Sequence, residues 1–116
     1  MNVILVTGGA GFIGSNFIRY FLRRNKNFLL INIDKLTYAG NLSNLNEIEN
    51  SPRYHFIKGD ICNRELISYV FKKYRPDFVI NFAAESHVDR SITNPTVFGE
   101  TNMLGTLTLL ESARNT

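Results

Sequence analysis

The chain has 116 residues, of which 44% are hydrophobic and 20% are charged, and its formal net charge is +3. This composition is typical of one soluble globular domain with its own core, and it argues against disorder. The sequence contains no apolar run near the roughly 18 residues of a membrane span and no signal peptide pattern, and its lone cysteine, Cys62, excludes an internal disulfide and fits a reducing cytoplasm.

Short apolar runs alternate with amphipathic stretches along the chain. Runs rich in β-branched and aromatic residues predict strands at 3–6, 28–33, 54–57 and 78–82. Apolar residues at helical spacing predict helices over 13–24 and 64–74, with a shorter one over 42–49. A last helix is predicted from the Asn94-Pro95 cap to about Arg114.

This alternation of strands and helices predicts an α/β fold. Nearly all-apolar strands are typical of a parallel sheet that helices cover on both faces. Right-handed crossovers then give a Rossmann-type, doubly wound sheet whose first four strands have the order 3-2-1-4. We expect residues 1–116 to form one incomplete dinucleotide-binding domain that stops before a fifth strand.

The positive charge is concentrated at 23–26 and 72–75, where the two main helices are predicted to end. Cations are favoured there by the exposed carbonyls of the last turn. We therefore interpret both clusters as solvated helix ends, and the alternative is a surface that binds nucleic acid backbone.

Three glycines at a spacing of three, Gly8, Gly11 and Gly14, lie at the predicted turn from the first strand to the first helix. Glycine lets a backbone approach a ligand closely, and the N–H groups that open a helix favour a pyrophosphate. A plain tight turn is the alternative. The context favours the dinucleotide site, because a carboxylate, Asp34, ends the next strand twenty positions after Gly14.

Asp34 is predicted to accept both hydroxyls of an adenine ribose, and the alternative is a residue that only caps the following turn. A 2′-phosphate at roughly 4 Å from this carboxylate would cost on the order of 4 kcal/mol. Lys35 would offset part of this cost, but no arginine lies nearby in the sequence. We therefore predict NAD rather than NADP as the cofactor.

Two more segments follow strands at the same edge of the predicted sheet. Asp60 lies just after the third strand and is predicted to accept a hydrogen bond from the adenine amino group. Ala83 and Ala84 follow the fourth strand, where small side chains would let a ligand lie close to the backbone. Tight packing of a helix on the sheet explains these two alanines equally well.

The segment TGGAGFIG at 7–14 resembles the extended short-chain dehydrogenase/reductase superfamily. DKLTYAGN at 34–41, AAESHVDRSI at 83–92 and TNMLGTLTLLE at 101–111 are similar to the dTDP-glucose 4,6-dehydratases in particular. The resemblance implies a lyase of deoxysugar biosynthesis, such as that of rhamnose, which is a homodimer at full length. It implies that tightly held NAD oxidises C4 of the glucose, that water is lost across C5 and C6, and that the hydride returns to C6.

The resemblance also implies which residues surround these molecules. Backbone donors for the pyrophosphate come from Phe12 and Ile13. The other residues implied around the cofactor, from ribose through adenine to nicotinamide, are Asp34, Lys35, Leu36, Thr37, Asp60, Ile61, Phe82, Ala83, Ala84, Glu85 and Thr101. Ser86 is implied to reach the sugar substrate, while His87 receives no role beyond a structural hydrogen bond. No metal is implied.

Catalysis in the resembled family needs a Tyr-x-x-x-Lys pair beyond the fourth strand's helix and an Asp-Glu pair beyond a fifth strand. We therefore expect no catalytic residue in this chain and interpret it as the cofactor-binding front part of a longer enzyme, inactive alone. Tyr69 and Lys73 have the tyrosine–lysine spacing, but their helix precedes strand four; we expect Tyr69 to be packed. Two alternatives are a non-catalytic NAD-binding sensor or scaffold and another nucleotide-sugar epimerase or dehydratase of the superfamily.

Overall fold

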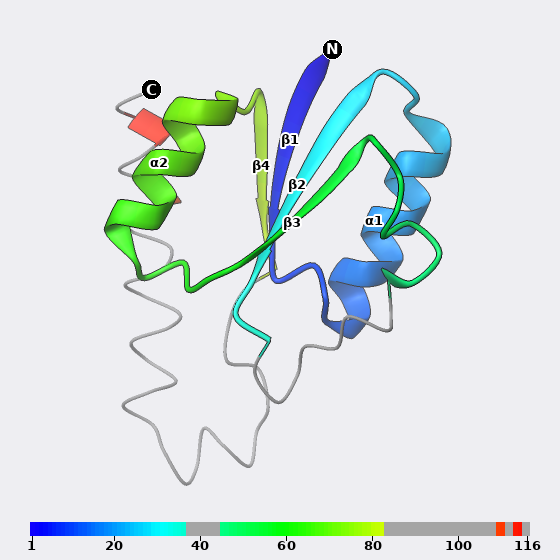
Figure 1. The fold of residues 1–116 in the computed structure, drawn as a ribbon, viewed down its shortest axis with the longest axis horizontal. Coiled ribbons are helices and arrows are strands. Elements are labelled where there is room, and N and C mark those ends of the chain that lie inside the picture. Colours follow the sequence, from blue (N-terminus) through cyan, green and yellow to red (C-terminus); the bar gives the residue numbers. More distant parts are fainter. Residues whose placement is uncertain (37–44, 83–108, 111–112, 115–116) are drawn as a thin grey trace, which may run out of the picture.

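The computed structural model describes residues 1–36, 45–82, 109–110 and 113–114. The elements in these ranges are β1 (Asn2–Thr7), α1 (Phe12–Arg24), β2 (Phe28–Asp34), β3 (Tyr54–Lys58), α2 (Arg64–Tyr74) and β4 (Phe78–Asn81) (Figure 1). The four predicted strands and the two main predicted helices are all present. Their bounds lie within one residue of the predicted ones, because the apolar pattern that defines each element also defines what it buries.

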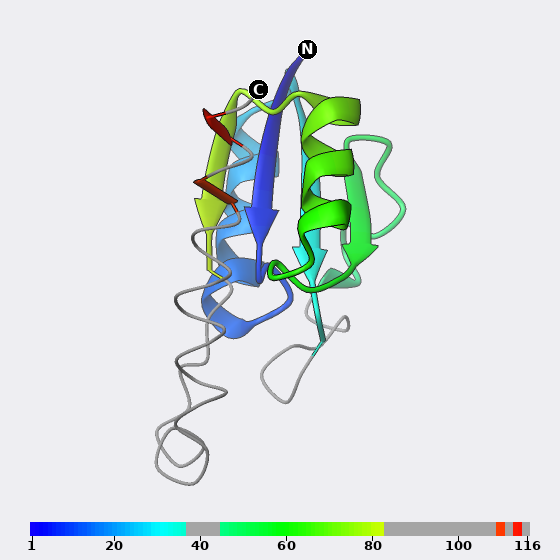
Figure 2. The same ribbon diagram turned by 90° about the vertical axis from the view of Figure 1, so that its left-hand side faces the viewer.

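The strands form one parallel sheet in the order β3-β2-β1-β4, which confirms the predicted topology. β1 pairs with β2 along its whole length, and on its other side it pairs with β4 from Ile4 to Thr7. Because the strands are parallel, their carboxyl ends all meet at one edge of the sheet (Figure 2). A ligand site of a doubly wound sheet is expected at this edge.

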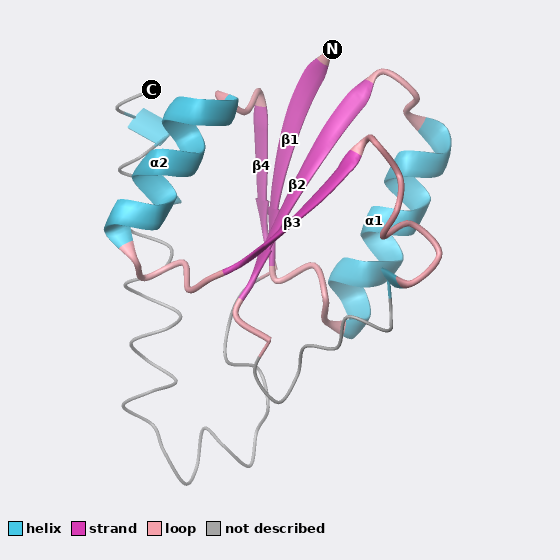
Figure 3. Ribbon diagram, viewed as in Figure 1, coloured by secondary structure: helices cyan, strands magenta, loops and turns pink. Residues whose placement is uncertain are grey.

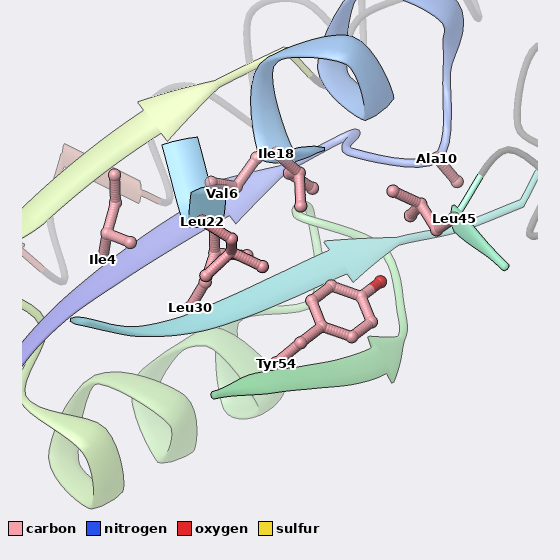
Figure 4. Close-up of a cluster of buried hydrophobic side chains, with 8 residues drawn as sticks. All are labelled: Ile4, Val6, Ala10, Ile18, Leu22, Leu30, Leu45 and Tyr54. Carbon is pink, nitrogen blue, oxygen red and sulfur yellow. The ribbon is translucent and has the colours of Figure 1, made fainter. Parts of the chain in front are cut away.

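Helices α1 and α2 cover opposite faces of the sheet (Figure 3). Successive side chains of a strand point to opposite faces, so Ile4 and Val6 pack on the α1 side while Leu5 packs on the α2 side. The buried residues on the α1 side are Ile4, Val6, Ala10, Ile18, Leu22, Leu30, Leu45 and Tyr54 (Figure 4). Those on the α2 side are Leu5, Ile31, Ile33, Ile61, Ile67, Val70, Phe71 and Leu109. The sheet is therefore doubly wound, as predicted.

The short helix predicted over 42–49 is wrong in its described part. Residues 45–50 form turns instead, in which the Ile48 N–H donates to Leu45 O at 3.1 Å and the Ser51 N–H donates to Ile48 O at 2.9 Å. These bonds span three residues rather than the four of an α-helix. Leu45 is nevertheless buried in the α1-side cluster, which accounts for its apolar character.

The last predicted helix, over 94–114, lies mostly outside the described residues. Its described positions, 109–110 and 113–114, are helical, and they lie on the same side of the sheet as α2 (Figure 1). Leu109 is only 5% exposed and belongs to the α2-side cluster. Leu109 therefore packs against the face that α2 covers.

β4 is an edge of the sheet in the part of the chain that the structure describes. It pairs with β1 on one side, and it leaves Phe78 and Val79 exposed. β3 forms the opposite edge. The central position therefore belongs to β1 and β2, and these two strands carry the turn and the side chains of the candidate site.

Candidate functional site

The turn at 8–11 between β1 and α1 lies against the end of β2. Three successive N–H groups of the turn donate hydrogen bonds to β2 in this way: Gly8 N to Ile33 O at 2.8 Å, Gly9 N to Asn32 Oδ1 at 3.0 Å, and Ala10 N to Asp34 Oδ2 at 2.8 Å. Two of the three acceptors are side chains. The path of the turn is therefore set by the polar residues of β2 as well as by its glycines.

The three glycines at a spacing of three differ in whether the structure requires glycine at their positions. Gly8 has a φ of 73°, in the left-handed region that favours glycine. A Cβ on Gly14 would lie 2.5 Å from Gly8 O and 2.8 Å from the Cα of Gly9, so the helix can approach the turn only without a side chain there. Gly11 has φ −74° and ψ 177°, which any residue adopts. The backbone conformation of Gly11 thus does not require a glycine.

Helix α1 begins without a side-chain cap. Its first internal hydrogen bond joins the Ser15 N–H to Gly11 O at 2.9 Å, so the N–H groups of Phe12 and Ile13 precede the helical ladder. The side chains of Phe12 and Ile13 are 79% and 69% exposed, and the first turn carries no acidic residue. This end of the helix therefore has the N–H groups and the positive dipole end that suit an anion.

Asp34 is nearly buried, with 8% of its surface exposed, and both of its oxygens bind backbone N–H groups. Oδ2 accepts from Ala10 at 2.8 Å, and Oδ1 accepts from Leu36 at 2.7 Å. The bond to Leu36 is the turn-capping interaction that was the alternative for this residue. A carboxylate offers about four lone-pair sites, and hydrogen bonds within the described residues use two of them. Asp34 can therefore cap the turn and bind a ribose at the same time.

Leu36 has a φ of 59°, which is uncommon for a leucine. Its side chain packs against the α1-side cluster, and its N–H donates to Asp34. Such a conformation costs on the order of 1–3 kcal/mol and persists only where its surroundings hold it. The backbone is therefore strained two residues after the carboxylate that is predicted to bind the ribose.

Asp60 and Lys35 meet across the ends of β3 and β2. Lys35 Nζ lies 3.4 Å from Asp60 Oδ2, and the Cys62 N–H donates to Asp60 Oδ1 at 2.9 Å. Burial raises the pKa of Asp60, but the Cys62 hydrogen bond and the Lys35 charge outweigh burial and hold the pKa below its usual value. Asp60 is therefore an ionised carboxylate at neutral pH, and both of its oxygens act as hydrogen-bond acceptors.

Two other predicted cofactor residues turn their side chains into the core. Ile61 is 3% exposed and belongs to the α2-side cluster. The Phe82 ring centre lies 5.6 Å from that of Phe17 on the α1 side, and the Phe82 N–H donates to Thr7 O at 2.7 Å. The side chain of Ile61 is therefore withdrawn from the surface, whereas Phe82 is only half-buried. The remaining predicted residues, Thr37, Ala83, Ala84, Glu85, Ser86, His87 and Thr101, lie outside the described residues.

Tyr69 is not packed as expected. It is 56% exposed on α2, and Lys73 Nζ lies 5.5 Å from the centre of its ring. α2 buries Ile67, Val70 and Phe71, so position 69 falls on the outer face of the helix. The basic residues at the ends of both helices lie in their last turns, as predicted.

Two buried polar residues near the site, Thr7 and Asn32, make hydrogen bonds that the sequence analysis did not predict. Thr7 is fully buried, and its hydroxyl donates to Asn81 Oδ1 at 2.6 Å. Asn32 is also fully buried, and its Nδ2 donates to the hydroxyl of Tyr54 at 3.1 Å. The sequence did contain a sign of the Asn32 bond: this asparagine follows the apolar residues FLLI in a predicted strand, and a buried amide needs a hydrogen-bond partner.

Other kinds of site find no support within the described ranges. No three His, Cys, Asp or Glu side chains lie close enough together there to hold a metal ion. None of the helices described has both the length and the apolar character that crossing a bilayer requires. Cys62 is half-buried.

Comparisons with known proteins agree with this geometry. The sequence profile of the family described as GDP-mannose 4,6 dehydratase matches residues 5–116. The dTDP-glucose 4,6-dehydratase of Haemophilus influenzae is 59% identical over 112 residues, which cover 97% of this chain and 33% of that protein.

Solved structures of nucleotide-sugar enzymes are also similar to this chain. The dTDP-glucose 4,6-dehydratase of Streptomyces venezuelae with NAD and TYD bound has a TM-score of 0.90 and 46% identity, over 97% of this chain and 36% of that one. The UDP-glucose 4-epimerase of Thermotoga maritima with UDP-glucose has a TM-score of 0.86 and 34% identity, over 97% and 34%. The chain thus spans about a third of the length of these relatives. Because the family profile covers the chain almost from end to end, the chain belongs to the GDP-mannose 4,6 dehydratase family.

Proposed function

We propose that this chain is the cofactor-binding part of a dTDP-glucose 4,6-dehydratase. This lyase converts dTDP-glucose to dTDP-4-keto-6-deoxyglucose for deoxysugar biosynthesis in the cytoplasm. Support comes from the solved structures, where identity is 46% to such an enzyme and 34% to a UDP-glucose 4-epimerase, and from the 59% identity to a second such enzyme. The observation that carries the proposal is the uncapped start of α1 beside a carboxylate that ends β2.

The described residues fit NAD at three points. The N–H groups of Phe12 and Ile13 would bind the pyrophosphate, with Gly11 leaving room for it. Further lone-pair sites of Asp34 would accept the hydroxyls of the adenine ribose. Asp60, ionised beside Lys35, would accept from the adenine amino group. When bound, NAD supplies the transient oxidation of the sugar that the reaction needs.

Asp34 favours NAD over NADP. A 2′-phosphate at roughly 4 Å from its carboxylate costs on the order of 4 kcal/mol per unit charge at an intermediate dielectric. Lys35 is the nearest cation in the sequence, but its charge is shared with Asp60 at 3.4 Å. It therefore offsets less of this repulsion than its position in the sequence suggests.

We place the chemistry of bond breaking outside residues 1–116. The described residues bind and orient a dinucleotide, and Ser86 is the one residue proposed to reach the sugar. The whole enzyme is proposed to be a homodimer whose substrate is dTDP-glucose. It follows that the 116-residue chain binds NAD and does not turn over dTDP-glucose.

Titration calorimetry with NAD and NADP on the unaltered chain tests the proposal. We expect NAD to bind at least about tenfold more tightly than NADP, a difference of about 1.4 kcal/mol. Both cofactors are measured on one protein because the oxygens of Asp34 also hold the turn, so a substitution of Asp34 would change the turn as well as the cofactor contact. Equal affinities would contradict the role of Asp34. Absence of NAD binding by a chain that is folded by circular dichroism would overturn the proposal.

A further inference from the structure

β2 presents two polar side chains on the α1 side of the sheet, Asn32 and Asp34. They lie two positions apart, so both point to the same face of the strand. Asn32 is fully buried, and Asp34 is 8% exposed. An amide inside an apolar layer is destabilising unless it is hydrogen-bonded. The hydrogen bonds of its amide must therefore compensate for the burial of Asn32.

Asn32 binds the glycine turn on one side and Tyr54 on the other. Its Oδ1 accepts from the Gly9 N–H at 3.0 Å, and its Nδ2 donates to the Tyr54 hydroxyl at 3.1 Å. The reversed amide would point its NH2 group at the Gly9 N–H, and two donors would then face each other. The Gly9 N–H can only donate and so sets the orientation of the amide, whereas the Tyr54 hydroxyl can donate or accept and holds the other end of the amide through Nδ2.

The same amide explains why position 9 is a glycine. A Cβ there would lie 2.4 Å from Asn32 Oδ1 and 2.4 Å from Ile18 Cδ1. The turn and β2 are thus shaped to each other, with the amide filling the space that a side chain of residue 9 would need. Gly9 does not belong to the three glycines at a spacing of three, Gly8, Gly11 and Gly14, so its fit to Asn32 gives it a separate structural reason.

Tyr54 comes from β3 and is 6% exposed. Burial raises its pKa, the hydrogen bond from Asn32 lowers it, and the charges of Asp34 and Glu49 raise it, so the pKa lies above its usual value. The phenol therefore remains neutral at neutral pH. Its hydroxyl end points toward the part of the buried cluster where Ala10 and Leu45 lie (Figure 4).

We propose that Asn32 is a positioning residue for the pyrophosphate site, and that Tyr54 anchors its amide from β3. Asn32 holds the Gly9 N–H toward β2, beside the bond from Ala10 to Asp34. The N–H groups at the start of α1 then face outward, where an anion can reach them. This inference rests on the proposed function, because the anion is the pyrophosphate of NAD.

The test compares three variants with the unaltered chain. Asn32→Leu keeps the size of the side chain and removes both hydrogen bonds, and Tyr54→Phe removes only the hydroxyl. Ile31→Val is the matched control, because Ile31 is buried in β2 on the α2 side, away from the turn. NAD affinity is measured by calorimetry at a temperature where circular dichroism shows every variant to be folded.

We expect Asn32→Leu to weaken NAD binding by about tenfold or more and Tyr54→Phe by roughly threefold, the effects of losing net hydrogen bonds. Ile31→Val lowers the melting temperature but changes the affinity by less than about twofold, because a lost methyl group there leaves the turn in place. If Asn32→Leu and Tyr54→Phe keep the affinity of the unaltered chain while melting earlier, their role is merely structural and the proposal is overturned.

A second readout does not depend on the cofactor. Exchange of the Gly9 amide proton, followed by nuclear magnetic resonance without NAD, should become faster in Asn32→Leu and Tyr54→Phe and remain unchanged in Ile31→Val. If the unaltered chain fails to bind NAD, the proposed function fails and the exchange data decide alone. Faster exchange in both variants then supports the positioning of the turn by Asn32, and unchanged exchange overturns it.

Discussion

Replacing Gly14 by alanine should destabilise the protein although it adds only one methyl group to a helix. The new Cβ would lie 2.5 Å from Gly8 O and 2.8 Å from the Cα of Gly9, whereas ordinary contacts begin at 3.4 Å. The chain must therefore move by about 0.9 Å, the difference between 3.4 and 2.5 Å. Both contacting atoms belong to the main chain, and the turn is held by the Gly8 N–H bond to Ile33 O. A side-chain rotation cannot relieve such a contact.

The size of the effect follows from two opposing contributions. Overpacking costs about 1–3 kcal/mol, and a contact with rigid backbone belongs at the upper end of this range. Alanine gains about 1 kcal/mol over glycine through its higher helix propensity. We therefore expect Gly14→Ala to lower the free energy of unfolding by about 2 kcal/mol, or the melting temperature by roughly 8 °C for a domain of this size.

Gly11→Ala is the matched control, because φ −74° and ψ 177° suit alanine. This substitution should leave stability unchanged or raise it by about 0.4–1 kcal/mol through the unfolded chain, yet it should weaken NAD binding, and Gly11→Val should abolish it. Urea denaturation followed by circular dichroism measures stability, and calorimetry measures the affinity. Equal stability losses in Gly14→Ala and Gly11→Ala would refute the division of the glycines into structural and ligand-facing ones, as would full NAD affinity in Gly11→Val.

Three further predictions concern other parts of the chain. Arg75→Gly should raise the free energy of unfolding by about 1 kcal/mol, because Arg75 ends α2 with a φ of 47° that glycine adopts without strain; an unchanged urea midpoint would contradict this. The ionised form of Asp60 is stabilised in the folded state, so its contribution is present above the usual carboxyl pKa of about 4 and is lost as the pH falls through the lower folded value. The urea midpoint should therefore drop between neutral and acid pH, and this drop should be smaller in Asp60→Asn than in the unaltered chain. The purified chain with NAD and dTDP-glucose should form no 4-keto-6-deoxy product, and product that disappears in Tyr69→Phe would show that this exposed tyrosine is catalytic.

The elements of this fold could be predicted because their information is local. Each strand is an apolar run, and each main helix repeats its apolar residues at helical spacing, so burial and hydrogen bonding agree on the same bounds. The spacing of Gly8, Gly14 and Asp34 located the turn and the carboxylate for the same reason. The helix predicted over 42–49 is wrong in its described part, because a buried residue, Leu45, occurs there in a turn.

The partners of individual side chains could not be predicted, because they come from distant parts of the chain. Arg53 donates to Asn25 O at 2.9 Å and to Leu22 O at 3.1 Å, so it binds the carbonyls that end α1 from 28 and 31 positions away. The bond between Asn32 and Tyr54 joins two strands in the same way. Tyr69 was expected to pack because it is aromatic, but its place on the helix faces outward.

The hydrogen bonds that join the turn to β2 also bear on the order in which the protein folds. They connect residues 23 to 25 positions apart, whereas the bond from Thr7 to Asn81 spans 74 positions. Closing a shorter loop loses less chain entropy, and contacts of short sequence separation form faster. We therefore expect β1, α1 and β2 to form a folding nucleus that already contains the turn and Asp34. On a ribosome, which releases the N-terminal end first, this half of the proposed dinucleotide site would take shape before β4 has been synthesised.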